Sequence, residues 1–108
     1  MGKEWIKINS EELGIKPDVY VRILRTTLEP GVKDLSELDK IIETGDLKQI
    51  GTITHRLKGT FSNLRIKDVA APCEAIHTLS KTIGNRERMR QNFTQLKKAF
   101  ENFKIQIE

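Results

Sequence analysis

Apolar residues recur every three or four positions along most of the chain, the spacing that places side chains on one face of an α-helix. The first such stripe begins after Pro17, a residue that suits the first turn of a helix, and it ends where Pro30-Gly31 interrupts the pattern. We therefore expect a first helix over about residues 17–28. Its buried side is formed by Val19, Tyr20, Ile23, Leu24 and Leu28.

Two longer stripes follow. The second helix is expected from about Val32 to Thr44, because Gly45 suits a helix end and Asp46 suits the cap of the next helix. Its inward positions are Val32, Leu35, Leu38, Ile41 and Ile42. The third helix then runs from Asp46 to near Arg65. Its inward positions are Leu47, Ile50, Ile53, Leu57, Phe61 and Leu64.

The last two stripes predict two more helices. Asp68 is the expected cap of the fourth helix, which places Pro72 in the first turn; a helix that began earlier would bend at Pro72. Its inward positions are Val69, Cys73, Ile76, Leu79 and Ile83. Gly84-Asn85 separates this helix from the last one. The inward positions of that last helix are Met89, Phe93, Leu96, Phe100 and Phe103.

The fold class follows from these stripes. The segment before Pro17 reads as a lead-in whose Trp5, Ile6 and Ile8 pack on the bundle end, with one short turn starting at Ser10. Alternating apolar runs and Asn-Gly or Asp-Gly hairpin turns are missing, which argues against strands. We predict an all-α protein, with residues 1–108 forming one up-and-down four-helix bundle that carries an extra short N-terminal helical segment.

Composition adds constraints on partners and compartment. The formal net charge is +4, but the Lys and Arg residues are spread along the chain without a run of five or six. We interpret them mainly as solvated helix faces rather than a nucleic-acid footprint. The single cysteine, Cys73, fits a reducing compartment and a packing role in its stripe. A secretory signal and a membrane-spanning stretch are both lacking, so we expect a cytoplasmic protein without membrane insertion.

His55 is the most informative residue. Stepping about 100° per residue places the apolar stripe of the third helix about 160° from His55, so the ring is expected to point to solvent. Small residues surround it on this outer face: Gly51, Thr52, Gly59 and Ser62. Lys58 also lies on this face. A solvated face usually carries long polar side chains at such positions.

The two glycines need an explanation, because each costs about 0.5–1 kcal/mol relative to alanine inside a helix. Small neighbours let the His55 ring protrude, so that the active site of another protein can close over it. A neutral imidazole is a nucleophile at cytoplasmic pH, and Lys58 would offset the negative charge of a phosphoryl group on it. The alternative is that His55 is an ordinary exposed histidine.

The motif around this ring resembles a known signature. His55-Arg56-Leu57-Lys58-Gly59, followed by Asn63-Leu64 and later Cys73, is similar to the pattern of histidine-containing phosphotransfer (Hpt) domains. That pattern is His-x-Leu-Lys-Gly, then Asn-Leu-Gly, then a Cys preceding Leu-Glu. The Gly45-Asp46 junction also resembles the turn that precedes the histidine helix in this family.

The resemblance implies a four-helix bundle and a role as a phosphorelay intermediate. His55 would accept a phosphoryl group from a receiver-domain aspartate and pass it to another receiver, while Lys58 stabilises the group. The docking face would comprise Gly51, Thr52, Arg56, Gly59 and Ser62. Such domains are carriers and not enzymes. The required Mg²⁺ sits on the receiver, so we expect no cofactor and no metal on this chain.

The implied partners are a response-regulator receiver domain, a hybrid sensor kinase, or both, and the chain is expected to be a monomer. Two positions depart from the family pattern. Arg65 stands where the family often has glycine, and His77 stands where it often has glutamate or glutamine. His77 could still donate a hydrogen bond, and Lys81, one turn later, could supply a second cation. Alternatively, both residues only border the core.

Three other readings compete with phosphotransfer. The bundle could be an interaction or scaffold domain that has lost the activity. It could be a basic nucleic-acid-binding domain, with Arg86, Arg88 and Arg90 as its footprint, although no recognition-helix pattern accompanies them. A metal enzyme using both histidines is the weakest reading, because a matched set of carboxylates or thiolates is missing.

Overall fold

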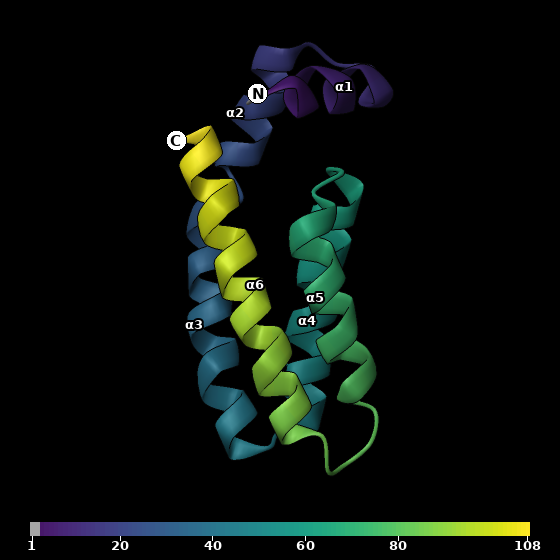
Figure 1. Cartoon of the computed structure of the whole chain (residues 1–108), viewed down its shortest axis with the longest axis vertical. Helices are drawn as coiled ribbons and strands as arrows, with labels where there is room; N and C mark the ends of the chain where they lie inside the picture. The colour runs from purple at the N-terminus through teal and green to yellow at the C-terminus, as the bar shows by residue number, and fades with distance from the viewer. Residues whose placement is uncertain (1–2) are drawn as a thin grey trace.

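The computed structural model describes residues 3–108 and consists of helices joined by short turns. The helices are α1 (Glu4–Leu13), α2 (Pro17–Arg25), α3 (Leu28–Thr44), α4 (Leu47–Asn63), α5 (Lys67–Leu79) and α6 (Arg86–Ile107). Helices α3 to α6 run alternately up and down, while α1 lies across one end of the bundle and α2 connects it to α3 (Figure 1). Residues 3–108 contain no strand, so the all-α bundle is confirmed.

The core lies along the length of the four long helices. Helix α5 packs closely against both α4 and α6, and α3 closes the bundle against the same two helices. Phe61 of α4 stands edge-on to Phe100 and Phe103 of α6, with ring centroids 6.2 and 5.4 Å away. The inward positions expected for α4 and α6 are buried, apart from Leu47 and Leu64 at the ends of α4, which are partly buried.

Helix α3 begins earlier than its sequence pattern suggests. The expected break at Pro30-Gly31 was wrong, because the chain turns at Thr26-Thr27 and α3 starts at Leu28. Pro30 is then the third residue of the helix, where its missing N–H would have no partner inside the helix anyway. Val32, expected to be buried, is 49 % exposed.

Helix α5 is displaced toward the N-terminus relative to expectation. It begins at Lys67, so Asp68 is not its cap, and Pro72 lies inside the helix rather than in its first turn. It also ends at Leu79. Ile83 consequently falls in the turn before α6 and is 86 % exposed, so its expected place in the core was wrong.

The N-terminal segment is a full helix and not a single turn. Ser10 is buried inside α1 rather than starting a turn, and Ile8 is exposed, contrary to expectation; Trp5 and Ile6 do pack against the core. Tyr20 on α2 anchors this end of the molecule. Its hydroxyl donates to the carbonyl of Leu64 and accepts from the amide of Asn9 at 3.2 Å.

Helix α4 ends as expected, at the turn that carries Arg65. This residue adopts a left-handed backbone conformation with φ of 67°. A residue with a side chain pays about 1–2 kcal/mol for that conformation, which explains why glycine suits the position. The carbonyl of Arg65 accepts a hydrogen bond from Asn9, and its side chain forms an ion pair with Glu12 at 3.3 Å, so α1 holds this turn in place.

Replacing Gly31 or Gly59 by alanine should change the stability of the bundle in opposite directions. A Cβ atom at Gly31 would lie 2.6 Å from Cε1 of the buried Phe100 ring, whereas a Cβ at Gly59 would meet no atom within 4 Å. We expect Gly31→Ala to lower the free energy of unfolding by about 1–3 kcal/mol through overpacking. Gly59→Ala should raise it by about 0.5–1 kcal/mol through helix propensity. Urea denaturation measures both, and equal effects would contradict this packing.

Candidate functional site

His55 lies near the middle of α4, and its side chain is exposed as the helical register predicts. The start of the helix is fixed by Asp46, whose carboxylate accepts from the backbone N–H of Gln49 at 3.1 Å. The opposite face of α4 is buried in the core through Ile50, Ile53, Leu57 and Phe61. A rigid, well-anchored helix therefore presents the imidazole to solvent.

Helix α5 runs antiparallel to α4 beside this ring. The rings of His55 and His77 lie with their centroids 5.4 Å apart and their planes tilted by 40°. About one turn from this pair, toward the C-terminal end of α4, Lys58 Nζ lies 3.4 Å from Glu74 Oε1 of α5. These contacts, together with the contact of His77 with Gly51, form what we call the α4–α5 seam. The seam brings two of the predicted site residues, His55 and His77, together.

The hydrogen bond at the other end of the seam determines which ring nitrogen of His77 carries a proton. Nδ1 of His77 lies 3.1 Å from the carbonyl oxygen of Gly51. A carbonyl can only accept a hydrogen bond, so Nδ1 must be the donor. In the neutral ring, Nε2 is then the nitrogen with the free lone pair.

The two glycines flanking His55 differ in their surroundings. Gly59 faces open space, in line with the cleared surface expected around His55. At Gly51, however, a Cβ would lie 3.2 Å from the hydroxyl oxygen of Ser80, a buried residue at the end of α5. Gly51 therefore lets α5 approach α4 closely. The missing side chain at Gly51 thus serves the packing of two helices, whereas at Gly59 it leaves the surface open.

Two of the other residues expected to form the docking face, Thr52 and Arg56, make hydrogen bonds within the chain. Thr52 is exposed, and its hydroxyl donates to the carbonyl of Lys48 at 3.0 Å; Ser62 is exposed as well. Arg56 points toward α3, where its guanidinium donates to both carboxylate oxygens of Asp34 at 2.8 and 3.3 Å. These hydrogen bonds raise the pKa of Arg56. Sequence reasoning did not find Asp34.

Lys81 lies beyond the end of α5, in the turn that leads toward α6, and is exposed. Because α5 ends at Leu79, Lys81 is not on the same helix as His77, contrary to expectation. Lys81 directly follows Ser80, whose hydroxyl oxygen lies near Gly51, whereas Lys58 lies about one turn beyond His55 toward the C-terminal end of α4.

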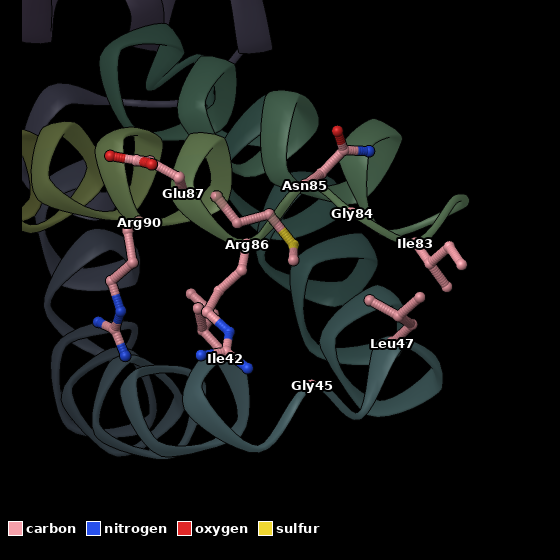
Figure 2. A pocket seen from close by; sticks show the side chains of 10 residues that line it. Ile42, Gly45, Leu47, Ile83, Gly84, Asn85, Arg86, Glu87 and Arg90 are labelled. Atoms are coloured by element: carbon pink, nitrogen blue, oxygen red, sulfur yellow. The ribbon is translucent and has the colours of Figure 1, made fainter.

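Grooves lie at two places on the part of the surface that the structure describes. One groove, at the end of the bundle, is lined by residues such as Ile42, Leu47, Ile83 and Arg90 (Figure 2). Another lies between α3 and the start of α4 and includes Glu37 and Thr52. His55 lines neither groove, and an imidazole on a convex helical face is accessible to a partner protein rather than enclosed around a small molecule.

The match to a known family decides how this surface is classified. A model of the Hpt domain matches residues 22–105, which span most of the chain and the whole α4–α5 seam. The chain belongs to the Hpt domain family. Neither a curated protein nor a solved structure matches it significantly. Hpt domains act in histidine phosphotransfer in two-component signalling, where they interact with receiver domains and kinases as carriers rather than catalytic enzymes.

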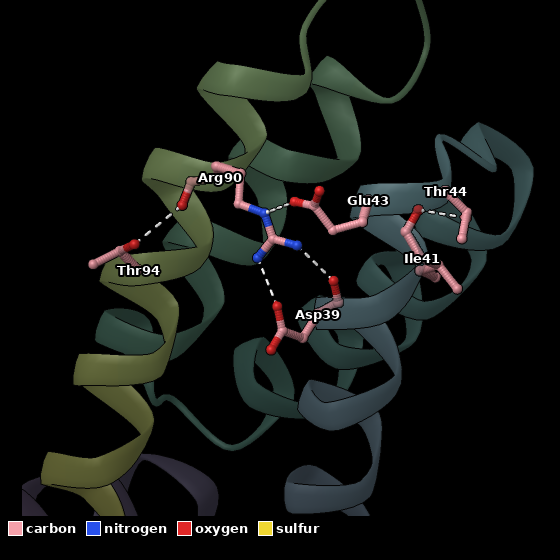
Figure 3. Close-up of polar contacts among 6 residues, drawn as sticks. All are labelled: Asp39, Ile41, Glu43, Thr44, Arg90 and Thr94. Atoms are coloured by element: carbon pink, nitrogen blue, oxygen red, sulfur yellow. Dashed lines mark hydrogen bonds and ion pairs between the residues drawn. The ribbon is translucent and has the colours of Figure 1, made fainter.

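The family match begins within α2, so α1 lies outside it. Within the matched part, the basic residues at the start of α6 form no uniform basic face. Arg90 donates to Glu43 Oε2, to Asp39 Oδ1 and to the carbonyl of Asp39, each at 2.6 Å, and these bonds join α6 to α3 (Figure 3). This arginine is therefore used to hold the bundle of the Hpt domain together.

Two further observations concern metals and membranes. In the part of the chain that the structure describes, no three His, Cys, Asp or Glu residues gather as metal ligands. Among the same residues, no helix has the length and apolar character needed to cross a bilayer.

Cys73 of the Hpt motif is buried in α5, where burial raises the pKa of its thiol to about 12. We expect the native domain to react with iodoacetamide at pH 8 far more slowly than the urea-unfolded chain, because the thiolate is the reactive form. Mass spectrometry of timed samples measures the alkylated fraction. Similar rates for the folded and unfolded chain would show that Cys73 is accessible and ionised.

Proposed function

We propose that His55 is the phosphoacceptor of this Hpt domain, taking a phosphoryl group from the aspartate of one receiver domain and passing it to another. The observation that carries the proposal is the exposed imidazole at the middle of α4, beside the open flank at Gly59. Membership of the Hpt family supports the reaction class.

The transfer is a single displacement at phosphorus. A ring nitrogen of neutral His55 attacks the phosphorus with its lone pair, the bond from phosphorus to the receiver aspartate breaks, and the carboxylate leaves with the bonding electrons. The proton on the other ring nitrogen of His55 remains there. The reverse displacement passes the group to the next receiver. Mg²⁺ bound by the receiver neutralises the transferring oxygens, and this chain contributes no cofactor.

Lys58 is the first cation available to the bound phosphoryl group. Its side chain is one-third exposed, and the 3.4 Å pair with Glu74 is long and open to solvent. Such surface pairs contribute about 0–1 kcal/mol, so Lys58 can turn from Glu74 toward a phosphoryl group that brings about two negative charges. Lys81 and His77 approach the group from α5 and the turn that follows it.

The receiver docks on the outer face of α4 in this proposal. Gly59, Thr52 and Ser62 keep the surface around His55 low, and Arg56, held by Asp34, forms its edge toward α3. Gly51 contributes by bringing α5 close rather than by contacting the receiver. The basic charge of the domain favours an acidic rim on the partner, and a monomer suffices for this geometry.

The chain has two histidines, which permits a matched test of the acceptor. We expect His55→Gln to abolish an acid-labile, alkali-stable label received from a phosphorylated receiver domain, because glutamine lacks the nucleophilic nitrogen. His77→Gln, the matched control, should still be labelled. Undiminished labelling of His55→Gln would refute the proposal. A folded wild-type protein that takes no label from any receiver would favour the scaffold reading.

Gly59 provides a separate test of docking. We expect Gly59→Glu to leave the bundle folded, since a Cβ there meets nothing within 4 Å, but to reduce transfer at least tenfold by crowding the receiver and opposing its acidic rim. Gly59→Ala is the size control and should transfer normally. Circular dichroism checks folding, and the rate of label transfer is the readout. Normal transfer by a folded Gly59→Glu variant would remove the docking argument.

A further inference from the structure

His77 has one nitrogen engaged and one free, and this asymmetry constrains what it can do for His55. Its Nδ1–H is held by the carbonyl of Gly51. In the neutral ring, Nε2 then carries no proton, and its lone pair can only accept a hydrogen bond. The centroids of the two rings lie 5.4 Å apart, so a charge placed on the His55 ring acts on the His77 ring across a short distance.

A phosphoryl group on His55 changes what is favourable at that nitrogen. The group brings about two negative charges and oxygen acceptors, which repel a lone pair but attract an N–H donor. His77 can offer such a donor only by binding a second proton, because its first is committed to Gly51. We infer that His77 takes up a proton when His55 is phosphorylated, so that proton binding and phosphoryl transfer are linked. This inference rests on the proposed function of His55.

Titratable and charged groups near His77 come from both helices of the seam. Helix α4 contributes the His55 ring and Lys58, and Lys58 is paired with Glu74 of α5. Lys81 comes four residues after His77 in the sequence, and its positive charge disfavours a second positive charge on the His77 ring. Helix α6 packs on the bundle through a buried stripe that is apolar, including Met89, Phe93 and Leu96. The phosphoryl group is therefore the largest charge that His77 meets.

The linkage has a definite sign. If the phosphorylated domain binds an additional proton at His77, lowering the pH favours the phosphorylated domain over the free one. Imidazole titrates near neutral pH, so the effect falls in the range of about pH 6–8.

The direct test measures His77 in the free and phosphorylated domain. The chain holds two histidines, so a protein labelled with ¹⁵N at histidine has only two imidazole rings to follow. Phosphoramidate, a small-molecule donor, phosphorylates His55 without a receiver. We expect the ring nitrogens of His77 to move toward the chemical shifts of an imidazolium when His55 is phosphorylated at constant pH near neutrality. Nitrogen shifts of His77 that stay those of the neutral ring would overturn the inference.

A second measurement uses the receiver. The equilibrium between phosphorylated receiver and phosphorylated domain is measured from pH 6 to pH 8 for wild type, for His77→Gln and for Lys81→Gln. Glutamine retains a donor for the Gly51 carbonyl but binds no proton near neutral pH, so the equilibrium of His77→Gln should depend less on pH than that of the wild type. Lys81→Gln keeps the imidazole that binds the proton, so its equilibrium should remain as steeply dependent on pH, although the loss of a nearby cation moves the pH at which the change occurs.

The outcomes separate the two proposals. If His55 is labelled and His77→Gln keeps the full pH dependence, the linkage is wrong while the acceptor stands. If no phosphohistidine forms at His55 from either donor, the acceptor proposal itself fails.

Discussion

At Gly51, helix α5 approaches α4 so closely that a single added carbon would lie 3.2 Å from the hydroxyl of Ser80. The same residue offers its carbonyl to Nδ1 of His77. Along the same seam His77 lies beside His55, and Glu74 beside Lys58. A side chain at Gly51 would press on Ser80 in this seam, so the place of the second imidazole is tied to the close packing of α4 and α5. The chemistry proposed for the surface thus depends on a packing contact.

Much of the bundle was predictable because its helices have sustained one-sided stripes. Where the prediction failed, local signals were overridden by contacts distant in sequence. Pro30-Gly31 reads as a break, yet Pro30 is harmless in the first turn of α3 and Gly31 fits against Phe100, sixty-nine residues later. Ile83 continues the stripe of α5, but α5 ends before it, and the residue is left in an exposed turn.

The site was predictable only in part. The register of α4 was sufficient to place His55 in solvent and Gly59 beside it. The family resemblance drew attention to His77, but its distance from His55 depends on how α4 and α5 pack, which a single stripe does not reveal. Likewise, the pairing of Arg56 with Asp34 joins α4 to α3, and the sequence of either helix alone contains no signal for it.

The central claim is that His55, and not the adjacent His77, carries the phosphoryl group. The most direct measurement is a proton–phosphorus correlation spectrum of the domain after it has been phosphorylated by a receiver. The account predicts that the phosphorus couples to the ring protons of His55, while the ring of His77 shifts without coupling. Coupling to the ring of His77, or phosphorus attached to neither imidazole, would contradict it.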